Sequence, residues 1–262
     1  RLPVGAGALY PADAGELGRR LHTLLEAAGP TPADAGAAPK AVIVPHGGLH
    51  CSGSVAARAF RALRPAASGI RRVVLVGPAH RGRVPGLVVP EADAFATPLG
   101  LVRVDAAAVS RLATLPFVRR DDGPHRREHG LEMQLPFLQF VLRAFEVVPI
   151  LAGDAGADAI AAALEHVWGG PETLVVASSD LCAHRPYREA LQMDTRTAAR
   201  IVRHERGYGR DTACGAAIID ALLQTACGRG LAAALLDLGN SADTGGDAGR
   251  VVGYGAFGFY AG

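Results

Sequence analysis

The stretch AVIVPHGG (residues 41–48) decides the fold, and VVLVGPAH (residues 73–80) repeats its form. Each begins with four apolar residues that do not alternate in polarity, which is typical of a strand buried on both faces. Each then enters a short turn of proline and glycine that carries one histidine. Because ligands of open α/β sheets bind at the carboxyl ends of the strands, we expect His46 and His80 to lie along one edge of a sheet.

Short apolar runs and longer amphipathic stretches alternate along the rest of the chain. The runs predict strands at Ala41–Val44, Val73–Val76, Gly86–Val89, Val147–Leu151, Leu174–Ala177 and Val251–Phe259. The longer stretches predict helices at Ala12–Ala28, Ser54–Leu63, Ala106–Thr114, Leu131–Ala144, Ala155–Val167, Tyr187–His204, Ala213–Ala226 and Leu231–Leu238. The segments Gly29–Lys40 and Ala242–Gly249 are rich in small residues and read as loops. The pattern predicts one α/β domain over residues 1–262, a three-layer α/β/α arrangement around a parallel or mixed sheet.

Composition excludes several classes of protein. The 262 residues carry a formal net charge of +2 with the two signs interspersed, so no nucleic-acid partner is expected. No apolar stretch approaches the roughly 20 residues of a membrane helix, and the amino-terminal residues RLPV do not resemble a signal peptide. The four cysteines form no CxxC pair. We therefore expect a cytoplasmic protein with free thiols.

Further polar residues are expected beside the two histidines. The sequence Ser178-Ser179-Asp180 follows another buried strand. In EHGLEMQLP (residues 128–136), His129 and Glu132 are three positions apart and would share one face of a helix. This spacing predicts an acid/base pair directed towards the same edge of the sheet. His22, His125, His166 and His204 read as ordinary surface histidines.

Cys214 supplies a different kind of group. It begins a predicted helix, and a helix amino terminus lowers the pKa of a thiol and favours the thiolate. Two imidazoles and a thiolate suit iron, copper or zinc better than magnesium or calcium. Three protein ligands leave coordination positions open for a small-molecule substrate. Alternatively, Cys214 could act as a nucleophile with a histidine as its base.

Six motifs in this order resemble the Memo family (mediator of cell motility; AmmeMemoRadiSam system protein B). They are AGALYP (6–11), PHGG (45–48), GPAH (77–80), EHGLE (128–132), SSD (178–180) and Cys214-Gly215, and VGY (252–254) completes the pattern. The family is similar in fold to class III extradiol dioxygenases, which are non-haem iron enzymes. The resemblance implies a metal site made by His46, His80 and Cys214, with Fe(II) as the favoured metal and copper or zinc as alternatives.

The resemblance also implies a function and partners. It indicates a dioxygenase-like oxidoreductase acting on a small molecule, aromatic by analogy, with His129, Asp180, Glu132 and His184 as candidate catalytic residues. A metal-binding protein without turnover is the alternative, and a hydrolase with a cysteine nucleophile is a third reading. By family analogy, partners would be radical-SAM and AMMECR-type proteins.

Two details of the sequence bear on the site residues. The family pattern Ser-Ser-Asp-Leu-Ser-His aligns without a gap to residues 178–183, which places Ala183 where the family has histidine and His184 one position later. On a loop His184 would reach the same space, whereas on a regular element it would point elsewhere. Cys227 is a second candidate for the cysteine ligand, because Cys227-Gly228-Arg229 also fits a Cys-Gly pattern.

Overall fold

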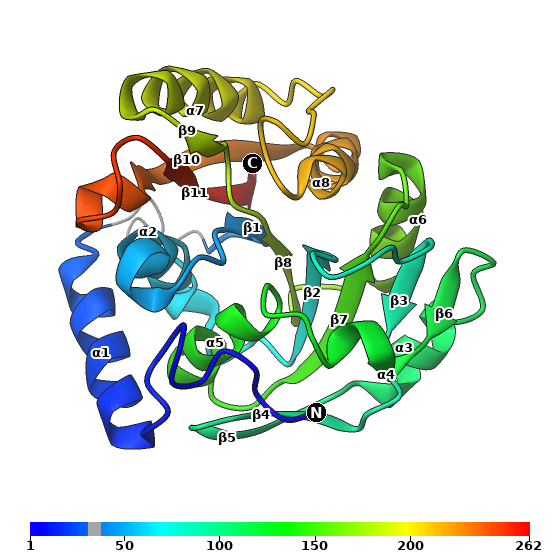
Figure 1. Cartoon of the computed structure of the whole chain (residues 1–262). Helices are drawn as coiled ribbons and strands as arrows, with labels where there is room; N and C mark the ends of the chain where they lie inside the picture. Colours follow the sequence, from blue (N-terminus) through cyan, green and yellow to red (C-terminus); the bar gives the residue numbers. More distant parts are fainter. Residues whose placement is uncertain (31–37) are drawn as a thin grey trace.

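A mixed sheet of nine strands forms the centre of the computed structural model, which describes residues 1–30 and 38–262 (Figure 1). Eight strands lie in the order β10-β11-β1-β8-β2-β7-β3-β6, and β9 pairs with β11. A separate hairpin consists of β4 and β5. The bounds are β1 Ala41–Val44, β2 Arg72–Pro78, β3 Leu87–Val89, β4 Ala94–Thr97, β5 Gly100–Arg103, β6 Val118–Arg120, β7 Glu146–Ala152, β8 Thr173–Ser178, β9 Ala183–Arg185, β10 Leu231–Asn240 and β11 Val251–Ala261.

The four central strands β1, β8, β2 and β7 are parallel to one another. Their residues are almost all buried, as expected for strands that are covered on both faces. Their carboxyl ends therefore lie along one edge of the sheet: Val44 at the end of β1 pairs with Ser178 at the end of β8. The predicted strands are confirmed, and this shared edge is where the predicted histidines emerge.

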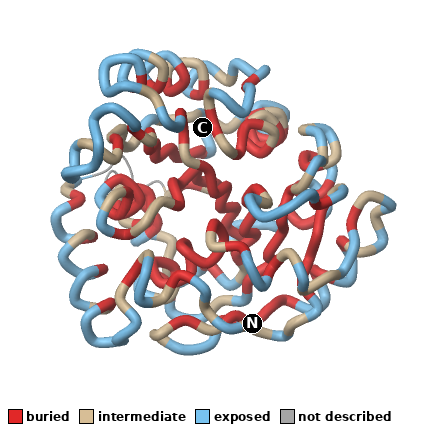
Figure 2. Tube along the Cα trace, in the orientation of Figure 1, coloured by how far each residue is buried: buried red, intermediate tan, exposed pale blue. Residues whose placement is uncertain are grey.

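Helices cover both faces of the sheet, so the predicted three-layer α/β/α fold is confirmed (Figure 1). Helices α1, α2 and α5 pack together on one side, while α3, α6 and α8 lie on the other, and α7 packs on β10 and β11. Figure 2 shows the sheet buried and the outer faces of the helices exposed. The bounds are α1 Ala14–Ala27, α2 Leu49–Arg61, α3 Ala106–Leu112, α4 Asp122–His125, α5 Leu135–Val141, α6 Ala157–Val167, α7 Tyr187–Val202 and α8 Ala216–Gly228, with 3₁₀ turns η2 Arg64–Ala66, η3 Glu132–Gln134 and η4 Ser241–Thr244.

One predicted helix is wrong. Leu231–Leu238 is rich in alanine and leucine, which favour helices, yet it forms strand β10. Gly230 adopts a positive φ of 67°, which turns the chain after α8. β10 then pairs antiparallel with β11 along its whole length. The backbone hydrogen bonds of this pairing override the local preference of the residues.

The predicted helix Leu131–Ala144 is shorter than expected and divided. A 3₁₀ turn, η3, leads into α5, which ends at Val141. His129 lies before both elements. Of the two predicted loops, Ala242–Gly249 begins within η4, whereas residues 31–37 of Gly29–Lys40 lie outside the described residues. Within residues 1–30 and 38–262, no helix is both long and apolar enough to cross a membrane.

His125 is a core residue and not the surface histidine that the sequence indicated. Only 1% of its surface is exposed, its Nε2 lies 3.1 Å from the carbonyl oxygen of Val88, and its ring meets the ring of Phe95 edge-on. Burial lowers the pKa of His125 to about 4. Between pH 6.5 and about 4, the His125 imidazole is therefore neutral in the folded protein but protonated in the unfolded chain.

We expect His125 to make the protein less stable in mild acid. Between pH 6.5 and about 4 only the unfolded state binds this proton, so the free energy of unfolding falls as the pH decreases, by up to about 3 kcal/mol. Urea unfolding of wild type and His125→Gln across this range would show the effect as a flatter pH dependence in the variant. Exposed His166, replaced in the same way, is the control. An identical pH dependence for wild type and His125→Gln would contradict the assignment.

Candidate metal centre

Three histidines converge at the carboxyl edge of the sheet. His46 follows β1, His80 follows β2, and His129 lies between α4 and η3. One ring nitrogen from each lies within 4.8 Å of the others. The ring centroids of His46 and His80 are 4.8 Å apart, and those of His80 and His129 are 5.2 Å apart. These three histidines could hold a metal ion, although the sequence had assigned His129 as an acid/base.

The thiol of Cys214 lies beside this cluster. Its Sγ is 3.4 Å from Nε2 of His46. Two contacts with Asp180 fix its position: the Cys214 amide donates to the Asp180 carbonyl at 3.2 Å, and the Asp180 amide donates to Sγ at 3.3 Å. Cys227 is in the last turn of α8, about 16 Å along the helix axis from the first residue of the helix, Ala216. The structure therefore places Cys214, and not Cys227, at the site.

The histidines stabilise Cys214 as a thiolate. Burial alone would raise its pKa, but the charge and hydrogen bond of His46 and a hydrogen bond with His80 outweigh burial and lower the pKa to about 6. The sequence predicted a lowered pKa from a helix amino terminus. Helix α8 begins only at Ala216, so neighbouring imidazoles are the cause. A thiolate is the form that binds a soft metal or attacks an electrophile.

Glu128 organises two of the histidines and is the main residue that the sequence analysis missed. Its side chain is 2% exposed. One oxygen, Oε1, lies 2.8 Å from Nδ1 of His80 and 3.3 Å from Nδ1 of His129, and it accepts the backbone amides of His129 and Gly130. Oε2 accepts the backbone amide of His80 at 2.7 Å. One carboxylate therefore orients both rings and their loops.

The pair of Glu128 and His80 is charged in the metal-free protein. Burial alone would lower the pKa of His80, but hydrogen bonds with Cys214 and Glu128 raise it to about 10. Burial alone would raise the pKa of Glu128, but the hydrogen bond and charge of His80 hold it at about 2. Burial lowers the pKa of His129, and the charge of His46 lowers it further. His129 is thus the neutral imidazole of the group.

His46 is held by a second set of contacts. Its Nδ1 lies 2.9 Å from the hydroxyl of Ser178, which also accepts from the side-chain amide of Gln134 at 2.9 Å. The carboxylate of Asp180 accepts the backbone amide of His46 at 2.7 Å and lies 3.8 Å from its Nε2. Asp180 therefore positions the His46 loop and also faces the cluster.

A close approach of Tyr254 explains the glycine that follows His46. A Cβ at Gly47 would lie 2.9 Å from the Tyr254 hydroxyl and equally close to its ring. Any larger residue would push the ring and the His46 loop apart. Tyr254 comes from β11, so this contact fixes the loop against the far end of the chain.

The donor set fits a transition metal. Hydrogen bonds occupy Nδ1 of His46 and His80, and Nδ1 of His129 faces Glu128, so these nitrogens are tied to protein partners. Such bonds leave Nε2 as the ligand atom and fix the orientation of each ring. Imidazole and thiolate donors suit iron, copper and zinc.

A cavity of about 580 Å³ opens beside the cluster. His80 and Cys214 lie in its wall with the first turn of α8, and Arg210 joins them from the connection between α7 and α8 that also carries Cys214. Alanines at 79, 152, 155, 216 and 217 supply much of the remaining wall. The volume is in the range of sites for small organic ligands.

The predicted role of Glu132 beside His129 is wrong. Glu132 is completely buried, but its carboxylate binds Arg1, Tyr10 and the backbone amides of Val4 and Gly5. His129 instead faces the other two histidines. His129 lies before η3 and is not helical, so the helical spacing of three residues does not put the two side chains on one face.

The prediction for His184 is also wrong. His184 lies in β9, is exposed, and has a positive φ of 60°. Within the described part of the chain it makes no hydrogen bond or ring contact with the cluster. Because it belongs to a strand paired with β11 rather than to a free loop, it does not take the place of the family histidine at 183.

The supporting residues differ in how well the sequence signalled them. Glu128 and Ser178 stand inside the family motifs EHGLE and SSD, so their positions were a usable signal for a supporting role. Gln134 lies beyond the EHGLE motif and carried no such signal, because its contact with Ser178 depends on the packing of η3 against the end of β8.

Comparison with known proteins agrees with this architecture. A family model described as Memo-like protein matches residues 1–257. A MEMO1 family protein of Aquifex aeolicus (strain VF5) is 32% identical over 97% of this chain and 97% of its own length. A MEMO1 family protein of Methanopyrus kandleri is also 32% identical, over 99% of this chain and 98% of its own length.

A solved structure supports the fold alone. The uncharacterized protein JW3007 from Escherichia coli K12 superposes with a TM-score of 0.53, at 14% sequence identity, over 83% of this chain and 98% of that chain. The family match and the relatives confirm the resemblance seen in the motifs. This chain belongs to the Memo family.

Proposed function

We propose that this chain is a metal-dependent oxidoreductase that acts on a small molecule. One observation carries the proposal: three histidines and a thiolate-favouring cysteine converge beside an open cavity of about 580 Å³. A structural metal site has no need of a cavity, whereas a catalytic site keeps a position open for substrate.

We assign His46, His80 and Cys214 as the metal ligands and His129 as the adjacent acid/base. Cys214 contacts His46 directly, and both Cys214 and His80 line the cavity. Burial and the charge of His46 lower the pKa of His129, which leaves its imidazole unprotonated at neutral pH and therefore able to accept a proton. Its Nδ1 faces Glu128, so Nε2 is the atom that would take the proton. Binding of His129 as a further ligand is the competing assignment, since it belongs to the same cluster.

Fe(II) or copper in this site would supply electron transfer between an organic substrate and oxygen. The protein's own contribution is to orient the ligands through Glu128 and Ser178 and to hold the substrate in the cavity. The cavity wall combines alanines with Asp154, Arg210 and Asp220, so it suits a small organic molecule that has both an apolar body and polar groups.

The contact of Cys214 with His46 also supports a second candidate function. A thiol with a pKa of about 6 that lies 3.4 Å from an imidazole has the arrangement of a nucleophile and its base. In this function Cys214 would attack an electrophilic substrate in the same cavity without the help of a metal. Alkylation of Cys214 separates the two functions. Added metal should slow alkylation if Cys214 is a metal ligand, and should leave the rate of alkylation unchanged if Cys214 is a nucleophile that works without metal.

The ligand assignment is tested by the metal content of variants. We expect wild type to bind close to one equivalent of Fe(II) or Zn(II), and His46→Ala, His80→Ala and Cys214→Ala to lose most of it. Cys227→Ala is the matched cysteine control and should retain the metal. Elemental analysis after anaerobic loading and desalting measures all five proteins. Retention of metal in both His46→Ala and Cys214→Ala would refute the site.

Glu128→Gln should weaken metal binding without removing a ligand. The amide cannot accept from both rings with the strength of a carboxylate, so His80 and His129 lose their fixed orientation. Loss of such a supporting partner typically lowers metal affinity about 10- to 100-fold. Competition with a chromophoric chelator measures the affinity, and Glu172→Gln, an exposed carboxylate, is the control. An unchanged affinity in Glu128→Gln would contradict its assigned role.

Oxidoreductase activity is tested by oxygen uptake. We expect the Fe(II)-loaded protein to consume oxygen with a catechol-type or other aromatic substrate, and His129→Ala to keep its metal but lose at least 100-fold in rate, as removal of a general acid/base does. If wild type binds iron or copper but consumes no oxygen with any of these aromatic substrates, the proposed oxidoreductase function is wrong and only the metal-binding role is left. If His129→Ala loses its metal, His129 is a ligand.

A further inference from the structure

We propose that Glu132 and Tyr10 are positioning residues that set the geometry of the metal site through an N-terminal strap, defined here as residues 1–10. The inference rests on the proposed metal function. Glu132 lies 0% exposed within the segment that carries His129, and its carboxylate accepts the Tyr10 hydroxyl at 2.5 Å and the Gly5 amide at 2.7 Å. It also accepts the Val4 amide at 2.8 Å and pairs with Arg1 at 2.9 Å.

The segment from Glu128 to Gln134 is the common support of all three histidines. At its start, Glu128 binds His80 and His129. In the middle, the carbonyl oxygen of Gly130 accepts the Ser178 hydroxyl at 2.8 Å, and that hydroxyl contacts His46.

The far end of the segment touches the same site. The side-chain amide of Gln134 donates to the carbonyl oxygen of Pro45, next to His46, at 3.1 Å. A shift of this segment would therefore move all three histidines, either directly or through one intervening side chain.

The strap holds that segment at its start and at its centre. Glu132 anchors its centre, while the guanidinium of Arg1 donates to the backbone carbonyls of His125 and Glu128. The strap reaches the second ligand loop as well, since the carbonyl oxygen of Leu9 accepts the amide of Leu49 at 2.7 Å. Leu49 begins α2, directly after the His46 loop. One strap thus connects the loop of His46 with the segment of His129.

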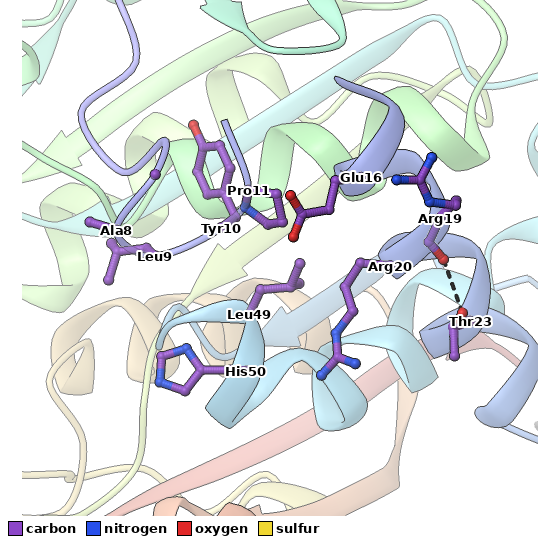
Figure 3. A pocket seen from close by; sticks show the side chains of 11 residues that line it. Ala8, Leu9, Tyr10, Pro11, Glu16, Arg19, Arg20, Thr23, Leu49 and His50 are labelled. Carbon is purple, nitrogen blue, oxygen red and sulfur yellow. Dashed lines mark hydrogen bonds between the residues drawn. The ribbon is translucent and has the colours of Figure 1, made fainter. Parts of the chain in front are cut away.

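Tyr10 joins the strap to the interior. Figure 3 shows its hydroxyl directed away from a surface cavity of about 600 Å³ that is lined by Arg20 and His50. Tyr10 is one of the residues that line the cavity, and its hydroxyl reaches Glu132 on the inner side. Loss of the hydroxyl therefore removes the inner contact and leaves the shape of the wall unchanged.

A purely structural role is the competing explanation. A buried carboxylate needs its partners whether or not a metal site is near, so loss of stability alone does not identify a positioning residue. Asp105 offers a matched control. It is 6% exposed, pairs with Arg72 at 2.6 Å and caps α3, and its hydrogen bonds involve none of the three histidines.

The test compares Tyr10→Phe and Glu132→Gln with Asp105→Asn, using full-length protein loaded with Co(II). We expect about 10-fold weaker Co(II) binding in Tyr10→Phe and a larger loss in Glu132→Gln, with altered ligand-field absorption in both. Asp105→Asn should lower the melting temperature and leave Co(II) affinity and spectrum unchanged. Tyr10→Phe is the conservative variant that keeps the test valid if Glu132→Gln does not fold.

Two results would overturn the inference. One is wild-type affinity and spectrum in folded Tyr10→Phe. The other is an equal loss of affinity in Asp105→Asn, because stability would then explain the effect. Failure of the wild-type protein to bind Co(II) would instead overturn the proposed metal function, so the two failures are distinguishable.

Discussion

The buried carboxylate of Glu128 is the constraint on which the site depends. A carboxylate that loses its water must be compensated, and here backbone amides and two imidazoles provide the compensation. The amides fix the chain around His80 and His129, and the contacts of Glu128 with Nδ1 of both rings leave Nε2 as the nitrogen that is free to bind a metal. The same carboxylate keeps His80 charged while the pKa of His129 is lowered. Neighbouring imidazoles thus differ in charge because their surroundings differ.

The charges of His80 and Cys214 bear on how the site would bind a metal. In the metal-free protein, the high pKa of His80 and the low pKa of Cys214 describe a cation and a thiolate that stabilise each other. Ligation requires His80 to lose its proton, so metal affinity depends on pH. The thiolate is already favoured, and no further rearrangement of Cys214 is needed because its contacts with Asp180 fix its position. The site is therefore organised by protein contacts before a metal binds.

The sequence predicted the parts of this arrangement that depend on the chain's local pattern. Unbroken apolar runs located the parallel strands, and the residues after each run had to emerge at one edge, so His46 and His80 were predictable. Their supporting contacts were not, because Gln134 reaches Ser178 only through the packing of η3 against β8. Propensity failed at β10, where pairing with β11 decides the structure. The spacing of His129 and Glu132 failed because it applies only within a helix, and His129 lies before the helical turn η3.

The exposed position of Ala183 bears on whether this chain has kept the family's chemistry. A histidine at this position would belong to β9, a short strand paired with β11 and exposed along most of its length. The three histidines and Cys214 meet without any contribution from that strand, and their supporting residues come from other elements. Replacement by alanine therefore takes no residue from this cluster, and the departure at Ala183 lies outside the candidate metal centre.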